Sequence, residues 1–138
     1  MGKENILSKL LHQEIRTEDD ILRIFDRAMS LVRILGIQPG NITEVKVNRK
    51  LRTHLGNTYK KDDKFKIEYH KMFLWRRDIE TECEGLLIHE ILHTCPDSMG
   101  HDGEWAKNAA IVAKAYPQFE NHMHEYFEVS KSYVQYLR

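Results

Sequence analysis

The sequence predicts an α+β fold: an N-terminal helix, a small three-stranded sheet, and two helices that follow the sheet. Apolar residues recur in the helical period over residues 18–35, and apolar and polar residues alternate in short segments between 43 and 69. The helical period returns over residues 78–94 and again over 103–115. A period of about 3.6 residues indicates a helix and a period of two indicates a strand, so the elements are expected in this order.

The chain has 138 residues, which is enough for one domain with a sizeable core and too few for two ordinary domains. We therefore expect residues 1–138 to form a single domain. No apolar run approaches the roughly 18 residues that a membrane-spanning helix needs, and the charged start is unlike a signal peptide. Two cysteines, Cys83 and Cys95, argue against a disulfide framework and favour a cytoplasmic protein in which both thiols are buried.

The first long helix is predicted over residues 18–35, where the apolar residues fall on one face. Thr17 can cap its first turn, and Asp20 occupies the third position of a capping box. Gly36 is expected to end it, because glycine is common just after the last helical residue. A shorter helical pattern covers residues 4–15.

Three short segments alternate in the strand period: residues 43–47, 58–61 and 65–69. The second and third flank the polar stretch Asp62-Asp63-Lys64, which indicates a hairpin turn. The sheet is therefore expected to consist of this hairpin and one preceding strand.

The segment 78–94 contains the pentapeptide His89-Glu90-Ile91-Leu92-His93 in an otherwise apolar run. On a helix, His89 and His93 leave the same face one turn apart, so two imidazole nitrogens can reach one metal ion. Glu90 projects about 100° away from His89 and can address a metal-bound water without ligating the metal. Pro96 ends the helix soon afterwards. The pattern is typical of a zinc metallopeptidase.

A catalytic zinc usually has three protein ligands and one open position. His101 is the best candidate for the third ligand, because neighbouring glycines permit a turn that brings it back over the helix that carries His89 and His93. Asp97, Asp102 and Glu104 are alternatives. Asp102 could also cap the following helix, expected over residues 103–115.

The net charge of zero conceals two blocks of opposite sign. Residues 44–77 hold 11 Lys or Arg against 4 Asp or Glu, whereas residues 78–104 hold 8 acidic residues and no Lys or Arg. The basic block would suit a polyanion such as DNA, and the alternative is a solvated face of the hairpin. Carboxylates of the acidic block could orient the N–H groups of histidine ligands.

These residues carry a resemblance to a known family. His89-Glu90-x-x-His93 followed by His101-x-Gly103-x-Trp105 resembles the SprT-like zinc metallopeptidase domain, a zincin-like fold in which a His-Gly-x-x-Phe/Trp segment supplies the third ligand. Residues 55–59 and 66–70 also look like the family's hairpin. The resemblance covers about residues 20–120.

Three features depart from the family's pattern. Asp102 is inserted between the histidine and glycine positions or stands in place of that glycine, and WLM-type peptidases, which carry a comparable His-Asp segment, are therefore a neighbouring possibility. The linker between His93 and His101 is seven residues, shorter than in many SprT-like proteins. Many SprT-like proteins also carry a C-terminal zinc ribbon, which we do not expect within residues 1–138.

The resemblance implies that His89, His93 and His101 bind a zinc ion (Zn2+) and that Glu90 is the catalytic base. It further implies a protein or peptide substrate, including proteins crosslinked to DNA, with DNA a candidate partner through residues 44–77. One alternative function is a non-catalytic DNA- or protein-binding module with a structural zinc, closed by a fourth ligand such as Cys95 or Asp97. Another is a zinc hydrolase that acts on a non-peptide substrate.

Other residues carry narrower expectations. Residues 65–73 are the candidate sheet edge for an extended substrate strand. Trp105 is expected to pack against the zinc helix. The remaining expectations concern His70 at the surface or in the cleft, Trp75 as a core anchor or an exposed stacking surface, His122-Met123-His124 in a solvated loop, Tyr116 or Tyr126 as a hydroxyl donor, and a terminal strand at 133–138.

Overall fold

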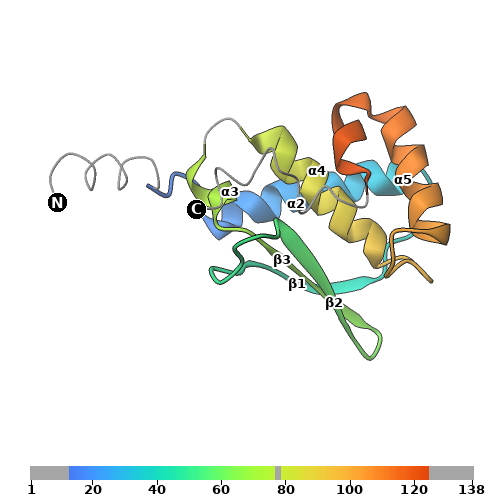
Figure 1. The fold of residues 1–138 in the computed structure, drawn as a ribbon, viewed down its shortest axis with the longest axis horizontal. Helices are drawn as coiled ribbons and strands as arrows, with labels where there is room; N and C mark the ends of the chain where they lie inside the picture. The colour runs from blue at the N-terminus through green and yellow to red at the C-terminus, as the bar shows by residue number, and fades with distance from the viewer. Residues whose placement is uncertain (1–12, 77–78, 125–138) are drawn as a thin grey trace, which may run out of the picture.

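The structure, a computed structural model, describes residues 13–76 and 79–124. Figure 1 shows a small sheet on one side of two crossing helices, with a further helix and a short turn of helix at one end; this is the predicted α+β arrangement. No helix in the described ranges is long and apolar enough to cross a membrane. The elements are α2 (Glu18–Ile34), β1 (Asn41–Val47), β2 (Gly56–Lys61), β3 (Lys64–Tyr69), α3 (Met72–Trp75), α4 (Glu80–His93), α5 (Gly103–Ala115) and the 3-10 helix η1 (Pro117–His122).

Helix α2 begins at the predicted capping box. The Thr17 backbone N–H donates to Asp20 Oδ2 at 2.8 Å, and the Asp20 N–H donates to Thr17 Oγ1 at 3.2 Å. Gly36 follows the helix with a φ of 81°, a left-handed conformation that glycine adopts without steric cost. The face that packs on the rest of the domain consists of Ile21, Ile24, Ala28, Met29 and Val32.

The sheet has the strand order β1-β3-β2. β3 pairs in parallel with β1 and antiparallel with β2, and the predicted hairpin joins β2 to β3. Alternate residues of β3, namely Phe65, Ile67 and Tyr69, are buried beneath the helices. The other face of the sheet is polar, as expected for a sheet covered on one side only.

The expectation that residues 65–73 form a sheet edge is wrong. β3 is the central strand, because β1 returns alongside it and leaves β2 at one edge of the sheet. Period-two alternation shows which residues face the core but carries no information on strand order. Among the described residues, no strand pairs with the outer edge of β2.

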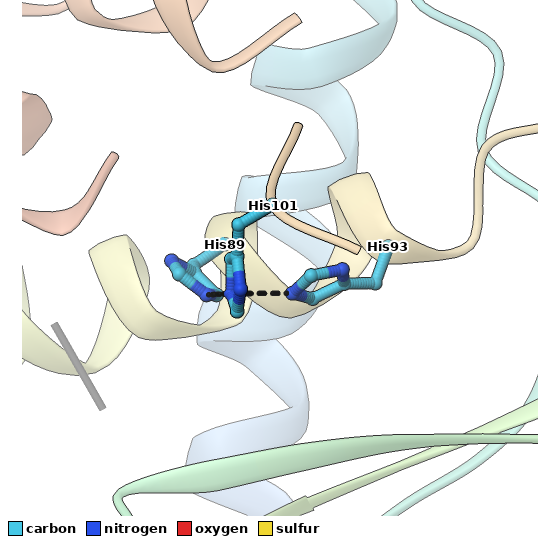
Figure 2. Close-up of side chains that lie close together, drawn as sticks. All are labelled: His89, His93 and His101. Atoms are coloured by element: carbon cyan, nitrogen blue, oxygen red, sulfur yellow. Dashed lines mark hydrogen bonds between the residues drawn. The ribbon is translucent and has the colours of Figure 1, made fainter. Parts of the chain in front are cut away.

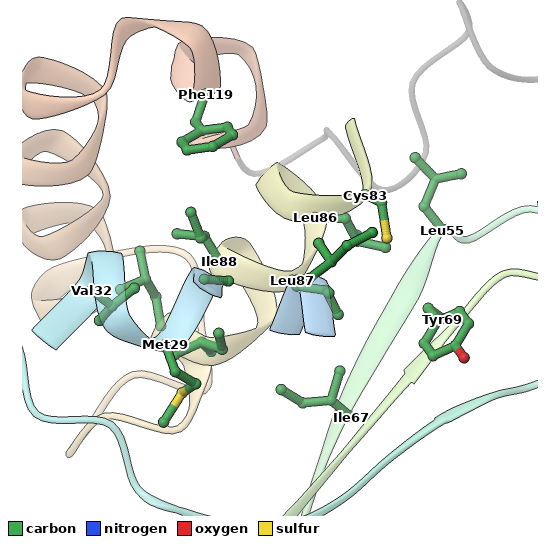
Figure 3. Close-up of a cluster of buried hydrophobic side chains, with 14 of the residues drawn as sticks. Met29, Val32, Leu55, Ile67, Tyr69, Cys83, Leu86, Leu87, Ile88 and Phe119 are labelled. Carbon is green, nitrogen blue, oxygen red and sulfur yellow. The ribbon is translucent and has the colours of Figure 1, made fainter. Parts of the chain in front are cut away.

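Helix α4 lies at the centre of the domain, where it contacts α2, β2, β3, α5 and η1. Its residues from Cys83 to His93 are all buried. Arg27 of α2 forms ion pairs with Glu80 and Glu84, and these pairs join the two helices at the start of α4. Figure 3 shows the core that surrounds α4, built from Met29 and Val32 of α2, Ile67 of the sheet, Leu86, Leu87 and Ile88 of α4, and Phe119 of η1.

Several narrower expectations have a clear outcome. Tyr116 donates its hydroxyl to the backbone oxygen of Leu31 at 2.9 Å, so it serves helix packing and not a cleft. Trp75 is partly buried against the core. The segment 4–15 lies mostly outside the described residues, and positions 13–15 are not helical. Tyr126 and the strand at 133–138 lie outside the described residues altogether.

His70 is buried, at 1% exposure, and is neither a surface nor a cleft residue. Its Nδ1 accepts a hydrogen bond from the backbone N–H of Met72 at 3.0 Å, which requires Nδ1 to be unprotonated. Burial lowers the pKa of His70 to about 4, and the positive charge of Lys71 acts in the same direction.

We therefore expect the titration of His70 to contribute to the pH dependence of stability. Between pH 6.5 and about 4, His70 binds a proton in the unfolded chain but not in the folded one. The free energy of unfolding therefore falls as the pH falls through this window, by about 1 kcal/mol per pH unit. Urea unfolding of the His70→Asn variant should show a smaller decline, while the exposed His54→Asn control keeps the wild-type slope. An unchanged slope in His70→Asn would contradict the assignment.

Candidate metal centre

Two elements supply the predicted histidines. Helix α4 carries His89 and His93 one turn apart, and both side chains are buried. His101 is half-buried in the loop between α4 and α5, which turns back over α4 (Figure 2). The Nε2 atom of His101 lies 3.1 Å from Nε2 of His89 and 3.1 Å from Nε2 of His93. The structure thus brings together the three residues that the sequence singled out, as a group that could hold a metal ion.

The spacing fits a small divalent ion. Zinc binds imidazole nitrogens at about 2.0–2.1 Å in a tetrahedral arrangement, which separates two such nitrogens by roughly 3.3 Å. The observed separations of 3.1 Å are close to this value. Little movement of the side chains would be needed for all three nitrogens to ligate one ion.

The hydrogen bonds of the Nδ1 atoms fix the tautomers of two of the three histidines. His89 Nδ1 donates to the backbone oxygen of His122 at 2.7 Å, and His93 Nδ1 donates to the backbone oxygen of Ser98 at 2.8 Å. A carbonyl oxygen can only accept, so each Nδ1 carries the proton. In a neutral imidazole the Nε2 atom is then an unprotonated acceptor, as a metal ligand must be.

The three nitrogens converge on one point. His101 Nε2 faces the Nε2 atoms of both His89 and His93, and a proton on it can be donated to only one of them. A cation at the point of convergence would interact with the lone pairs of all three together. This convergence is the strongest structural argument that the group could hold a metal ion.

The sequence did not indicate that His122 takes part in the site. His122 and Met123 are buried, so the expectation of a solvated loop is wrong for them, although His124 is exposed. The His122 ring packs against α4 and contacts Glu82 through Nε2. Its backbone oxygen is thereby held against His89. No sequence signal identifies such a contact, because the acceptor is a backbone atom 33 residues from its donor.

The acidic block therefore does not orient the two helix histidines in the way expected. Both Nδ1 acceptors are backbone oxygens and not carboxylates. Glu82 acts one step away, through the side chain of His122. The acidic residues Asp97, Asp102 and Glu104 are exposed and are not members of the metal-binding group. Asp102 precedes α5 at the predicted position, but its side chain makes no capping hydrogen bond.

Trp105 packs against α4, as predicted, and its ring also contacts those of the three histidines. Its ring stacks on that of His93 with centroids 5.3 Å apart, and it meets the ring of His101 edge-on at 4.8 Å. Its Nε1–H donates to the backbone oxygen of His89 at 3.2 Å. One buried indole thus holds the start of α5 and the His101 turn against α4.

Glu90 follows His89 directly on α4, is buried, and is not a member of the metal-binding group. Its Oε1 accepts a hydrogen bond from Thr58 Oγ1 of strand β2 at 2.8 Å. The sequence predicted a catalytic role for Glu90 and gave no indication that Thr58 contacts it.

The cysteines do not belong to the group formed by the histidines. Burial raises the pKa of Cys83 to about 12 and that of Cys95 to about 11. Within the described residues, this group has three members, which leaves room for a water or a substrate atom in a four-coordinate site.

No family model, curated protein or solved structure matches the chain. The interpretation of the site therefore rests on its residues and their geometry. These support a three-histidine group that could bind a metal ion, an arrangement compatible with a metalloenzyme.

Gly85 leaves the space that the His122 ring occupies. A Cβ atom at position 85 would lie 2.4 Å from His122 Cγ and 2.7 Å from its Nδ1. Gly85→Ala should therefore displace His122, deprive His89 of its acceptor, and weaken zinc binding by about 10- to 100-fold in chelator competition. Thr81→Ala, at an exposed position of the same helix, is the matched control. Wild-type affinity in a folded Gly85→Ala protein would contradict the role of the His122 carbonyl.

Proposed function

We propose that this chain is a zinc-dependent peptidase of the SprT-like type. The observation that carries the proposal is the convergence of three imidazole Nε2 atoms, two of them in a fixed tautomer. A buried glutamate, Glu90, follows the first of these histidines on α4 and does not belong to the group. A His-Glu-x-x-His helix with a third histidine supplies both the ligands and the base that this chemistry needs.

Zinc is the metal that the donor set favours. Three neutral imidazoles suit zinc better than the hard cations magnesium and calcium, which prefer oxygen ligands. When bound, zinc acidifies a coordinated water to a pKa of about 7 and polarises a carbonyl group. His89, His93 and His101 would hold it.

Glu90 is the proposed general base. It follows the first ligand directly on α4, and the hydrogen bond from Thr58 keeps its carboxylate in place. In peptide hydrolysis it would accept the proton of the attacking water and pass that proton to the leaving amine. A carboxylate in a largely buried position interacts strongly with both partners, because the local dielectric is low.

The substrate is proposed to bind as an extended strand along the outer edge of β2, and not along β3. Strand β2 contacts α4, and Thr58 joins it to Glu90 directly. An edge strand beside the base can bind a peptide through its main chain with little demand on sequence. A non-peptide substrate would make no use of this edge.

The competing function is a binding module in which zinc only braces the fold. A structural zinc is normally closed by four protein ligands. Cys95 and Asp97, the candidates for a fourth ligand, do not belong to the group in the described part of the chain. This favours an open, catalytic site.

Glu90→Gln tests the proposal most directly. Because the amide cannot accept the water proton, cleavage of an unstructured protein such as casein by the zinc-loaded chain should fall by at least about 100-fold. Zinc content should stay at the wild-type value, since Glu90 is not in the metal-binding group. Full activity in a zinc-replete Glu90→Gln protein would remove Glu90 from this role. No cleavage by the zinc-loaded wild type would favour the binding module.

DNA remains a proposed partner through residues 44–77, with DNA-crosslinked proteins in the cytoplasm as the corresponding substrate class. Ion pairs within the strands neutralise part of the positive charge in this block. Lys46 pairs with Glu44 on β1 at 3.3 Å, and Lys66 pairs with Glu68 on β3 at 3.6 Å. Lys61 and Lys64, at the tip of the hairpin, are exposed and remain as candidates for phosphate contacts.

The salt dependence of DNA binding tests this partner. If both hairpin lysines contact phosphates, the Lys61→Gln/Lys64→Gln variant should reduce the slope of log K against log salt by roughly 1.4 on single-stranded DNA. The matched control is Lys107→Gln/Lys114→Gln, which removes two exposed lysines from α5. An equal change in both variants, or no binding at low salt, would contradict the proposal.

A further inference from the structure

Strand β2 reaches the proposed base through one side chain. Thr58 Oγ1 lies 2.8 Å from Glu90 Oε1 and 3.1 Å from the backbone oxygen of the same residue. The two residues are 32 positions apart in the chain. Thr58 is half-buried and Glu90 is 1% exposed, so the contact is largely shielded from competing water.

The direction of the Thr58 side chain is set by the sheet. Thr58 pairs with Ile67 of β3, and residues directly opposite each other in an antiparallel pair share a face. Ile67 is fully buried under the helices, so Thr58 points to α4 and not to the outer face. As a β-branched residue, threonine has few accessible χ1 rotamers in a strand, so its hydroxyl is held in a narrow range of positions.

The hydroxyl of Thr58 has one proton, and two oxygens of Glu90 lie within its reach. They are the backbone oxygen and Oε1, so sharing of the proton between them links the carboxylate to the backbone of α4 at Glu90. A hydrogen bond to a charged acceptor is stronger than one between neutral groups. The glutamate side chain has three rotatable bonds, and a donor fixed by the sheet restricts the carboxylate to one arrangement.

We propose that Thr58 is a positioning residue for Glu90: it holds the carboxylate of the base in one orientation from the strand that borders the site. This inference rests on the proposed peptidase function. It adds that a single strand, β2, both sets the base and offers the outer edge for the peptide. The same strand would then position both the base and the substrate relative to each other.

The test compares Thr58→Val and Thr58→Ser in the zinc-loaded full chain. Valine keeps the shape of threonine and lacks the donor, so kcat should fall about 10- to 100-fold while KM and zinc content stay close to wild type. Serine keeps the donor and should restore most of the loss. Ser30→Ala removes an exposed hydroxyl from α2, outside the site, and should leave kcat unchanged. Wild-type kcat in Thr58→Val would overturn the inference.

A double-mutant cycle separates positioning from a general loss of structure. In the Glu90→Gln background, Thr58→Val should cause little further loss of residual activity, because the base is already absent. A structural role predicts the same loss in both backgrounds and no recovery by serine, and that result would also overturn the inference.

A second readout needs no turnover. The side-chain carboxylate of Glu90, followed by carbon-13 NMR in the zinc-loaded chain, should give one signal that moves or broadens in Thr58→Val and returns in Thr58→Ser. If the wild type cleaves nothing, the proposed function fails, and the NMR comparison still decides whether Thr58 orients Glu90. An unchanged Glu90 signal in Thr58→Val overturns the positioning role whatever the activity.

Discussion

The candidate site depends on where the protons of two imidazoles lie. Backbone oxygens of His122 and Ser98 accept from Nδ1 of His89 and His93, and this leaves both Nε2 atoms as acceptors that face His101. His101 Nε2 lies 3.1 Å from each of these two atoms, so three imidazole nitrogens converge as a group that could hold one metal ion. The fold around the site can be understood as what holds these nitrogens in place.

Two separate segments must pack on α4 to fix these protons and bring His101 to the site. The loop after α4 supplies the carbonyl of Ser98 and the ring of His101, and the segment ending in η1 supplies the carbonyl of His122. Trp105 fills the space between the loop and the helix, and Gly85 leaves room for His122. On the opposite side, the ion pairs of Arg27 with Glu80 and Glu84 join the start of α4 to α2. The helix is thus fixed from both sides before any ligand binds.

The sequence predicted the parts of the site that depend on local spacing. His89 and His93 are one helical turn apart, and glycine-flanked His101 needs only a tight turn, so neighbours in the chain determine their meeting. The parts that it missed are long-range. Thr58 meets Glu90 across 32 positions, and the ligand acceptors are backbone oxygens, which carry no residue-specific signal. The same limit applies to the sheet, where alternation predicted three strands and did not reveal that β3 lies between the other two.

The order of the strands matters for the chemistry as well as for the fold. If β3 were at the edge, the residue facing Glu90 would be Ile67 of β3. Ile67 is buried and apolar, and it has no donor for a carboxylate. With β2 at the edge, a hydroxyl stands at the equivalent level and contacts Glu90. The outer side of β2 retains backbone groups without a strand partner among the described residues. One face of this strand therefore serves the buried base, while its edge remains available to an extended chain, and both follow from the return of β1 to the far side of β3.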